Sequence, residues 1–110
     1  MIIDFNNIEE KHIEGFKGGN GPFLTRMSDD GKVKIMRNIL RPGSSIGLHT
    51  HEGNCEVMFV PKGEITSTCD GQKETAKAGE VHYCPEGHNH CAENLTNEDA
   101  EFFAVVAEGK

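Results

Sequence analysis

Short runs of alternating hydrophobic and polar residues follow one another from residue 21 to the end of the chain. Successive side chains of a β-strand point to opposite faces, so alternation with a period of two predicts half-buried strands. In the run at 32–40, Met36, Asn38 and Leu40 share one face while Arg37 and Ile39 share the other, and the pattern leaves open which set faces inward. The predicted strands are 21–27, 32–40, 55–61, 64–69, 72–78, 80–85, 90–95 and 100–107.

Turn signals, and no long helical pattern, separate these runs. Asp30-Gly31 and Asp70-Gly71 are typical of tight hairpin turns, in which glycine adopts a positive φ easily. Some helical spacing occurs at 7–16, where a glycine limits it to one or two turns, and residues 1–20 are predicted to form an N-terminal arm or strand. Strands without helices between them exclude a parallel α/β sheet and predict an all-β sandwich or barrel.

Length and charge narrow the class of protein. The chain has 110 residues, enough for a single domain over 1–110, and its net charge is −7 with the basic residues spread out. We therefore expect no nucleic-acid partner and no membrane partner. Because the first residues lack the features of a signal peptide and the chain has no CxxC pair, we expect a cytoplasmic protein with free thiols. Its cysteines are Cys55, Cys69, Cys84 and Cys91.

Three histidines and one glutamate form the candidate metal site. His49 and His51 are two apart and point the same way on a strand, and the turn at 52–54 resets the register so that Glu56 can face them. His90 joins them if its strand crosses beside theirs. Such a donor set suits a divalent transition metal. In octahedral geometry it leaves two positions open, whereas tetrahedral geometry would make a closed, structural zinc site.

Two spaced motifs carry a resemblance to a known family. Residues 43–63 match G-x5-HxH-x3,4-E-x6-G, and residues 79–94 match G-x5-PxG-x2-H-x3-N. The chain thus resembles the cupin superfamily, and in particular its small, single-domain microbial members. The resemblance implies a double-stranded β-helix, or jelly-roll barrel, that binds one metal per chain through His49, His51, Glu56 and His90. It also implies a homodimer assembled through edge strands. The matching positions are Gly43, His49, His51, Glu56, Gly63, Gly79, Pro85, Gly87, His90 and Asn94.

The other polar candidates are weaker. Tyr83 could point its phenol at the metal as a catalytic proton donor, or could simply pack on the barrel wall. His82 and His88 lie near motif positions without occupying them; for His88, supporting a ligand or facing solvent is favoured over ligation. His12 is expected at the surface.

The resemblance favours a metal-dependent enzyme acting on a small organic molecule, with Mn, Fe, Ni, Cu or Zn as the metal. Dioxygenase chemistry comes first, and isomerase or lyase chemistry second. The alternative is a cupin that binds or senses a small molecule without catalysis, although the helix-turn-helix typical of sensor cupins is missing from this sequence. A structural or storage domain is the third possibility, since the fold alone hosts many activities.

Overall fold

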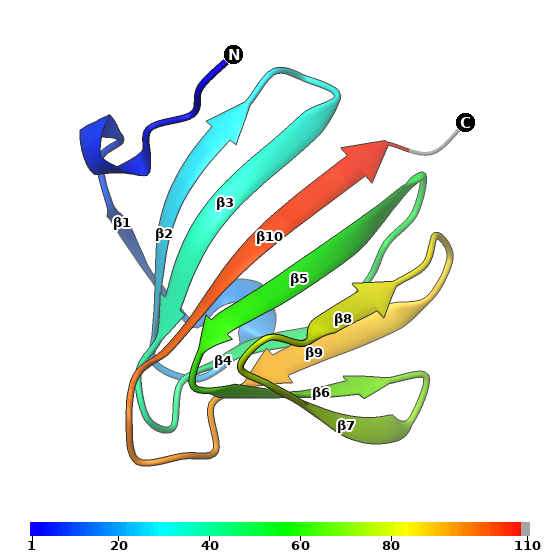
Figure 1. The fold of residues 1–110 in the computed structure, drawn as a ribbon. Coiled ribbons are helices and arrows are strands. Elements are labelled where there is room, and N and C mark those ends of the chain that lie inside the picture. The colour runs from blue at the N-terminus through cyan, green and yellow to red at the C-terminus, as the bar shows by residue number, and fades with distance from the viewer. Residues whose placement is uncertain (109–110) are drawn as a thin grey trace.

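The computed structural model describes residues 1–108, which form ten strands and two short 3-10 helices (Figure 1). Within this part of the chain no helix is long and apolar enough to cross a membrane. The elements are η1 (Phe5–Asn7), β1 (Lys11–Glu14), η2 (Phe16–Gly18), β2 (Pro22–Asp29), β3 (Val33–Leu40), β4 (Ser45–Thr50), β5 (Asn54–Lys62), β6 (Glu64–Cys69), β7 (Gln72–Lys77), β8 (Val81–Cys84), β9 (Asn89–Glu93) and β10 (Ala100–Glu108).

The strands form two antiparallel sheets. The larger sheet has the order β1-β2-β3-β10-β5-β8, and the smaller has the order β4-β9-β6-β7. In Figure 1 the larger sheet runs from β1 at the upper left to β8 at the right, and the smaller sheet lies below it. The order of strands in each sheet departs from their order in the chain, as in a jelly roll, so the predicted all-β class and fold are confirmed.

Both predicted hairpin turns are present. Asp70 and Gly71 have φ of 50° and 82°, and they join β6 to β7 with Cys69 paired to Gln72. Two positive φ values suit a two-residue hairpin, because that backbone follows the twist of the strands. In the other turn, the Asp30 carboxylate accepts hydrogen bonds from the amides of Lys32 (2.9 Å) and Val33 (2.8 Å).

The N-terminal segment differs from the prediction of helical turns at 7–16. Residues 11–14 form β1, which pairs with β2, and 3-10 turns occur only at the borders of that segment. Ile13 packs against the core from this strand. Pairing with the sheet edge satisfies the backbone of this short segment better than an isolated turn of helix, which is costly to nucleate.

The space between the sheets holds an apolar core. On β3 the inward set is Met36, Asn38 and Leu40, which settles the alternative left open by the sequence. On β5, Glu56, Met58 and Val60 point inward, as their shared parity predicts. The buried apolar cluster consists of Phe23, Met36, Leu40, Ile46, Met58, Val60, Ile65, Ala92, Ala100, Phe102 and Ala104.

A close backbone contact fixes η2 against β4. A Cβ at Gly47 would lie 1.9 Å from the carbonyl oxygen of Lys17, and a Cβ at Gly19 would lie 2.1 Å from that of Ser45. Only glycine leaves room for this approach. The contact holds Lys17, itself in a left-handed conformation with φ of 56°, beside the strand that carries His49.

Asn94, the last position of the second motif, ties three segments together. Its amide donates to the carbonyls of Leu40 (2.8 Å) and Glu98 (2.7 Å), and its side-chain oxygen accepts from the Thr96 amide (2.9 Å) and hydroxyl (2.7 Å). The residue is fully buried. Its role is therefore to satisfy backbone groups in the connection between β9 and β10.

Candidate metal centre

The structure brings the four predicted ligands together from three strands and one strand end. His49 lies on β4 and pairs with His90 on β9, while Glu56 lies on β5. His51 lies just past β4, where its N–H donates to the His88 carbonyl (3.0 Å) and its own carbonyl accepts from Gly87 (2.7 Å). The potential ligand atoms of the four side chains all lie within 4.8 Å of one another.

Their polar atoms converge on one point. The Glu56 Oε1 atom lies 3.1 Å from His51 Nε2 and 2.9 Å from His90 Nε2, and the two Nε2 atoms are 3.0 Å apart. His51, Glu56 and His90 are buried, and His49 is partly buried. A buried cluster of this kind is costly unless its groups are paired or bind a cation.

Hydrogen bonds at the far side of two imidazole rings orient them toward that point. His49 Nδ1 donates to the Gly47 carbonyl (2.7 Å), and His51 Nδ1 donates to Asn54 Oδ1 (2.6 Å). A neutral ring that carries its proton on Nδ1 has its lone pair on Nε2. When they are neutral, both rings therefore present a nitrogen lone pair to the centre, which is the usual arrangement of metal-binding histidines.

His82 supports the far side of the His90 ring in the same way. This role was not predicted from the sequence. It lies on β8, with its Nε2 3.1 Å from His90 Nδ1 and the two rings stacked at 5.2 Å. His82 is buried, and burial lowers its pKa, which favours the neutral ring. The signal that could have found it is strand parity, because His82 pairs with the inward-facing Met58.

The same parity corrects the expectation for Tyr83. This residue pairs with Val57 on the outer face of the larger sheet and is 54% exposed. Neighbours on a strand face opposite ways, so the inward His82 forces Tyr83 outward. Its phenol points away from the four ligands and is no proton donor for them.

The other two histidines lie outside the cluster. His88 is exposed and its ring contacts the Asp70 carboxylate, while its backbone carbonyl supports His51 as described above. His12 contacts Glu10 at the surface.

Burial and pairing shift the titration of the ligands. Burial raises the pKa of the Glu56 carboxyl, but its hydrogen bonds with His51 and His90 outweigh burial and lower the pKa to about 2. The hydrogen bond with Glu56 raises the pKa of His51, against the opposing effect of burial. Burial lowers the pKa of His49. Glu56 is therefore anionic at neutral pH.

These residues fit a divalent transition metal. Three imidazole nitrogens and one carboxylate oxygen form a mixed nitrogen and oxygen donor set, and the hydrogen-bond partners described above keep the nitrogen lone pairs pointing inward. The carboxylate supplies one negative charge to offset the charge of a cation. Four protein donors would leave an octahedral ion with two positions for other ligands.

A pocket of about 190 Å³, called here the front pocket, leads to the cluster. Lys17 and Lys34 are its basic lining residues, and Glu56 lies in its wall. Its full lining is Phe16, Lys17, Phe23, Met27, Lys34, Met36, Asn38, Ile46, His49, Thr50, His51, Asn54, Glu56 and Val106.

Known proteins resemble this chain in sequence and in fold. The chain is 33% identical over 112 residues to the oxalate-binding protein of Thermotoga maritima, covering 96% of this chain and 93% of that protein. A crystal structure of a predicted oxalate decarboxylase from T. maritima superposes with a TM-score of 0.92 at 32% identity, covering 99% of this chain and 100% of that one. KdgF from a Halomonas species shares the fold alone, with a TM-score of 0.82 at 14% identity over 100% of this chain and 94% of that one. Residues 36–106 match the family model of the cupin domain, so the chain belongs to the cupin family.

Proposed function

We propose that this protein binds one divalent transition metal through His49, His51, Glu56 and His90, and that the bound metal and the front pocket together bind a small carboxylate, with oxalate as the first candidate. One observation carries the proposal: the four donors converge, and three of them, His49, His51 and Glu56, line a pocket, so a metal held there would be reachable by a ligand. A chelating dicarboxylate could fill the two remaining positions of an octahedral ion.

The basic side chains of the pocket support an anionic ligand. The chain carries a net charge of −7, yet Lys17 and Lys34 line this pocket, and among the residues from 1 to 108 that line it the one carboxylate is Glu56. Lys17 is close enough to disfavour protonation of His51. Its left-handed backbone, wedged against Gly47, is a strained conformation of the kind found at functional sites.

The relatives support oxalate in particular. One is named an oxalate-binding protein and another a predicted oxalate decarboxylase, each at more than 30% identity and over nearly the whole chain. We place binding before catalysis because the pocket lacks an obvious acid–base group. Its one carboxylate, Glu56, is itself a proposed metal ligand, so a lysine is left as the available proton donor.

Catalysis is the second candidate, supported by the two coordination positions that the protein donors leave. Lyase chemistry on oxalate is favoured by the name of the second relative. The dioxygenase and isomerase activities predicted from the sequence stay predictions. Formate and carbon dioxide release from oxalate, or oxygen uptake with a panel of small organic molecules, would identify turnover.

The test is a pair of calorimetric titrations. Metal-free protein should bind about one Mn, Fe, Ni, Cu or Zn ion per chain, and the loaded protein should then bind oxalate, whereas the metal-free protein should not. Lys17→Gln should weaken oxalate binding about tenfold while metal affinity stays unchanged, and the exposed Lys73→Gln should change neither. Failure of every metal to bind, or equal oxalate affinity with and without metal, would contradict the proposal.

We also infer a homodimer. Six apolar side chains of β5, β8 and β10 form a continuous surface on the outside of the larger sheet, called here the outer apolar face. Val57, Phe59, Val81 and Tyr83 are 37% to 54% exposed there. Contiguous exposed apolar surface of this kind marks interaction sites. The face consists of Val57, Phe59, Val81, Tyr83, Phe103 and Val105.

A second copy of this chain fits this surface because of charge. Two chains of net charge −7 repel one another, and contact through an uncharged face brings the fewest like charges close together. Arg37 and Glu101, on strands β3 and β10 of the same sheet, form an ion pair at 2.7 Å and so offset each other's charge. This arrangement favours contact through a sheet face, whereas the resemblance predicts contact through edge strands.

Light scattering during gel filtration tests the dimer. Phe59→Glu should convert it to a monomer, while Leu95→Glu, which places the same charge on an exposed leucine of a loop, should leave it a dimer. A monomeric wild-type protein would refute the inference. The cytoplasmic location and the lack of nucleic-acid and membrane partners stay predictions.

A further inference from the structure

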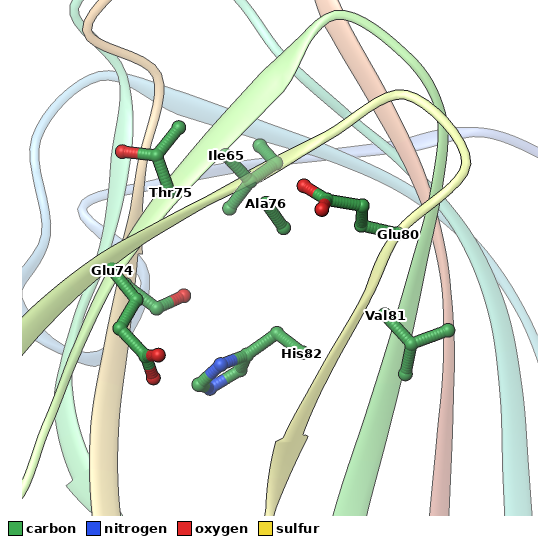
Figure 2. Close-up of a pocket in the computed structure, with 8 residues that line it drawn as sticks. Ile65, Glu74, Thr75, Ala76, Glu80, Val81 and His82 are labelled. Atoms are coloured by element: carbon green, nitrogen blue, oxygen red, sulfur yellow. The ribbon is translucent and has the colours of Figure 1, made fainter.

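A second cavity, called here the rear cavity, is lined by residues of β6, β7 and β8 and of the turn before β8 (Figure 2). Its volume is about 170 Å³, and its lining residues differ from those of the front pocket. In Figure 2 the imidazole of His82 projects into it toward the carboxylate of Glu74. Ser67 is buried in its wall, and the Oγ atom of Ser67 has no hydrogen-bond partner within the protein. The cavity is thus polar enough to admit water or a small polar molecule.

His82 joins this cavity to the metal centre. His82 Nε2 lies 3.1 Å from Nδ1 of His90, which is 1% exposed. For His90 to bind a metal through Nε2, its ring proton must sit on Nδ1, and the atom placed to accept that proton is His82 Nε2. His82 must then carry its own proton on Nδ1.

The hydrogen-bond partner of His90 is of a different type from the partners of His49 and His51. His49 and His51 are held by amide oxygens two and three residues away in sequence, Gly47 O and Asn54 Oδ1. His90 is held instead by a side chain from the opposite sheet, since β8 belongs to the larger sheet and β9 to the smaller. The orientation of His90 therefore depends on one replaceable side chain.

We propose that His82 is a positioning residue for the metal centre: by accepting the Nδ1 proton of His90 it keeps that ring's Nε2 directed at the metal, and small molecules can reach its place through the rear cavity. This inference rests on the proposed metal site.

Metal affinity in a set of His82 variants tests it. His82→Ala and His82→Phe remove the acceptor and should weaken binding of Co²⁺ or Cu²⁺ about 10- to 100-fold, with an altered visible spectrum or electron paramagnetic resonance signal. His82→Gln offers a carbonyl acceptor and should keep affinity within a few-fold of wild type. His12→Ala, a change at an exposed histidine, should have no effect.

Chemical rescue separates positioning from simple packing. Imidazole added to His82→Ala should enter the space left behind and restore affinity and spectrum. 1-Methylimidazole, which has an acceptor nitrogen and no N–H, should do the same, because the proposed role is to accept. Neither should help His82→Phe, in which a ring fills the space.

The outcomes are distinct. If wild type binds metal and all His82 variants match it, this inference is wrong while the proposed function stands. Weakened binding that neither imidazole restores indicates a packing role and also refutes it. If wild type binds no metal, both fail. Circular dichroism identifies any variant that does not fold; should His82→Phe be one, the alanine variant and its rescue decide the question.

Discussion

The two ends of the space between the sheets are built from the same strands but differ in chemistry. Along the inward face of β5, Glu56 lies at the metal end, and Val60 lies at the core end beyond Met58. On β10, Val106 pairs with Glu56 at the metal end, and the fully buried Phe102 lies toward the core end. One backbone architecture thus supports an apolar core and a buried polar cluster within a few residues of each other.

This difference indicates that the core end stabilises the fold and the metal end binds the metal. Burial of apolar side chains at the core end stabilises the fold at roughly 25 cal/mol per Å². At the metal end, burial of imidazoles and a carboxylate costs free energy, which the pairing of Glu56 with His51 and the hydrogen bonds on the far side of the rings offset. Variants at the core end should therefore change stability, and variants at the metal end should change metal binding.

The largest effect is expected at the core end. Phe102→Ala should lower the free energy of unfolding by about 3–5 kcal/mol, because it leaves a cavity among fully buried neighbours. Urea unfolding measures this loss. Metal affinity, measured where the variant is still folded, should stay near wild type. If Phe102→Ala lowered metal affinity as strongly as it lowers the free energy of unfolding, the two ends would not be separable.

His51→Ala probes the metal end. Removing this ligand should lower metal affinity at least about 100-fold, with an unfolding free energy within about 1 kcal/mol of the metal-free wild type. Elemental analysis and calorimetry provide the measurements, with His12→Ala as the matched control. Undiminished metal content in the His51 variant would exclude it as a ligand.

Asn94→Ala tests a motif residue that belongs to the fold. It should lower the free energy of unfolding by about 2 kcal/mol, because the Leu40 and Glu98 carbonyls lose their donor. Asn97→Ala, in the same loop and exposed, is the control. An equal loss of stability in both variants would refute the role assigned to Asn94.

The smallest effect is a pH dependence of opposite sign in the two forms of the protein. The raised pKa of His51 stabilises the metal-free fold below pH 6.5, and this effect is lost as pH rises through the pKa of the folded state. The lowered pKa of Glu56 stabilises the metal-free fold above pH 4.5, and this effect is lost as pH falls toward about 2. The metal-free protein should thus gain from this pair most between those limits.

Metal affinity should move the other way, falling about tenfold per unit as pH drops through the His51 pKa, because a proton then competes for Nε2. Thermal melts with and without metal across this range give both curves. Full metal retention below about pH 5 would contradict the assignment of imidazole ligands.

Alternation along the sequence predicted most of the strands, because side-chain parity is local. The meeting of His90 with the other three proposed ligands depends on which strands pair, so the sequence indicated it only through the resemblance to a family. Glu56, Met58 and Val60 face inward as their alternation requires. Residue type misled at β8, where the outward residues are the apolar Val81 and the aromatic Tyr83 and an inward one is the polar His82. Because the outer face of that sheet is itself apolar, hydrophobicity does not distinguish inside from outside there, and only the pairing with β5 does.

The seating of η2 on β4 has a consequence for the evolution of ligand choice. A single methyl group at position 47 would collide with the Lys17 carbonyl, so the turn that carries Lys17 or the strand beneath it would have to shift. Position 47 has no side chain in the front pocket, yet its backbone contact helps to place Lys17, which lines that pocket. If the front pocket binds an anion as we propose, its preference can be gained or lost through a backbone contact, without altering any group that touches the ligand.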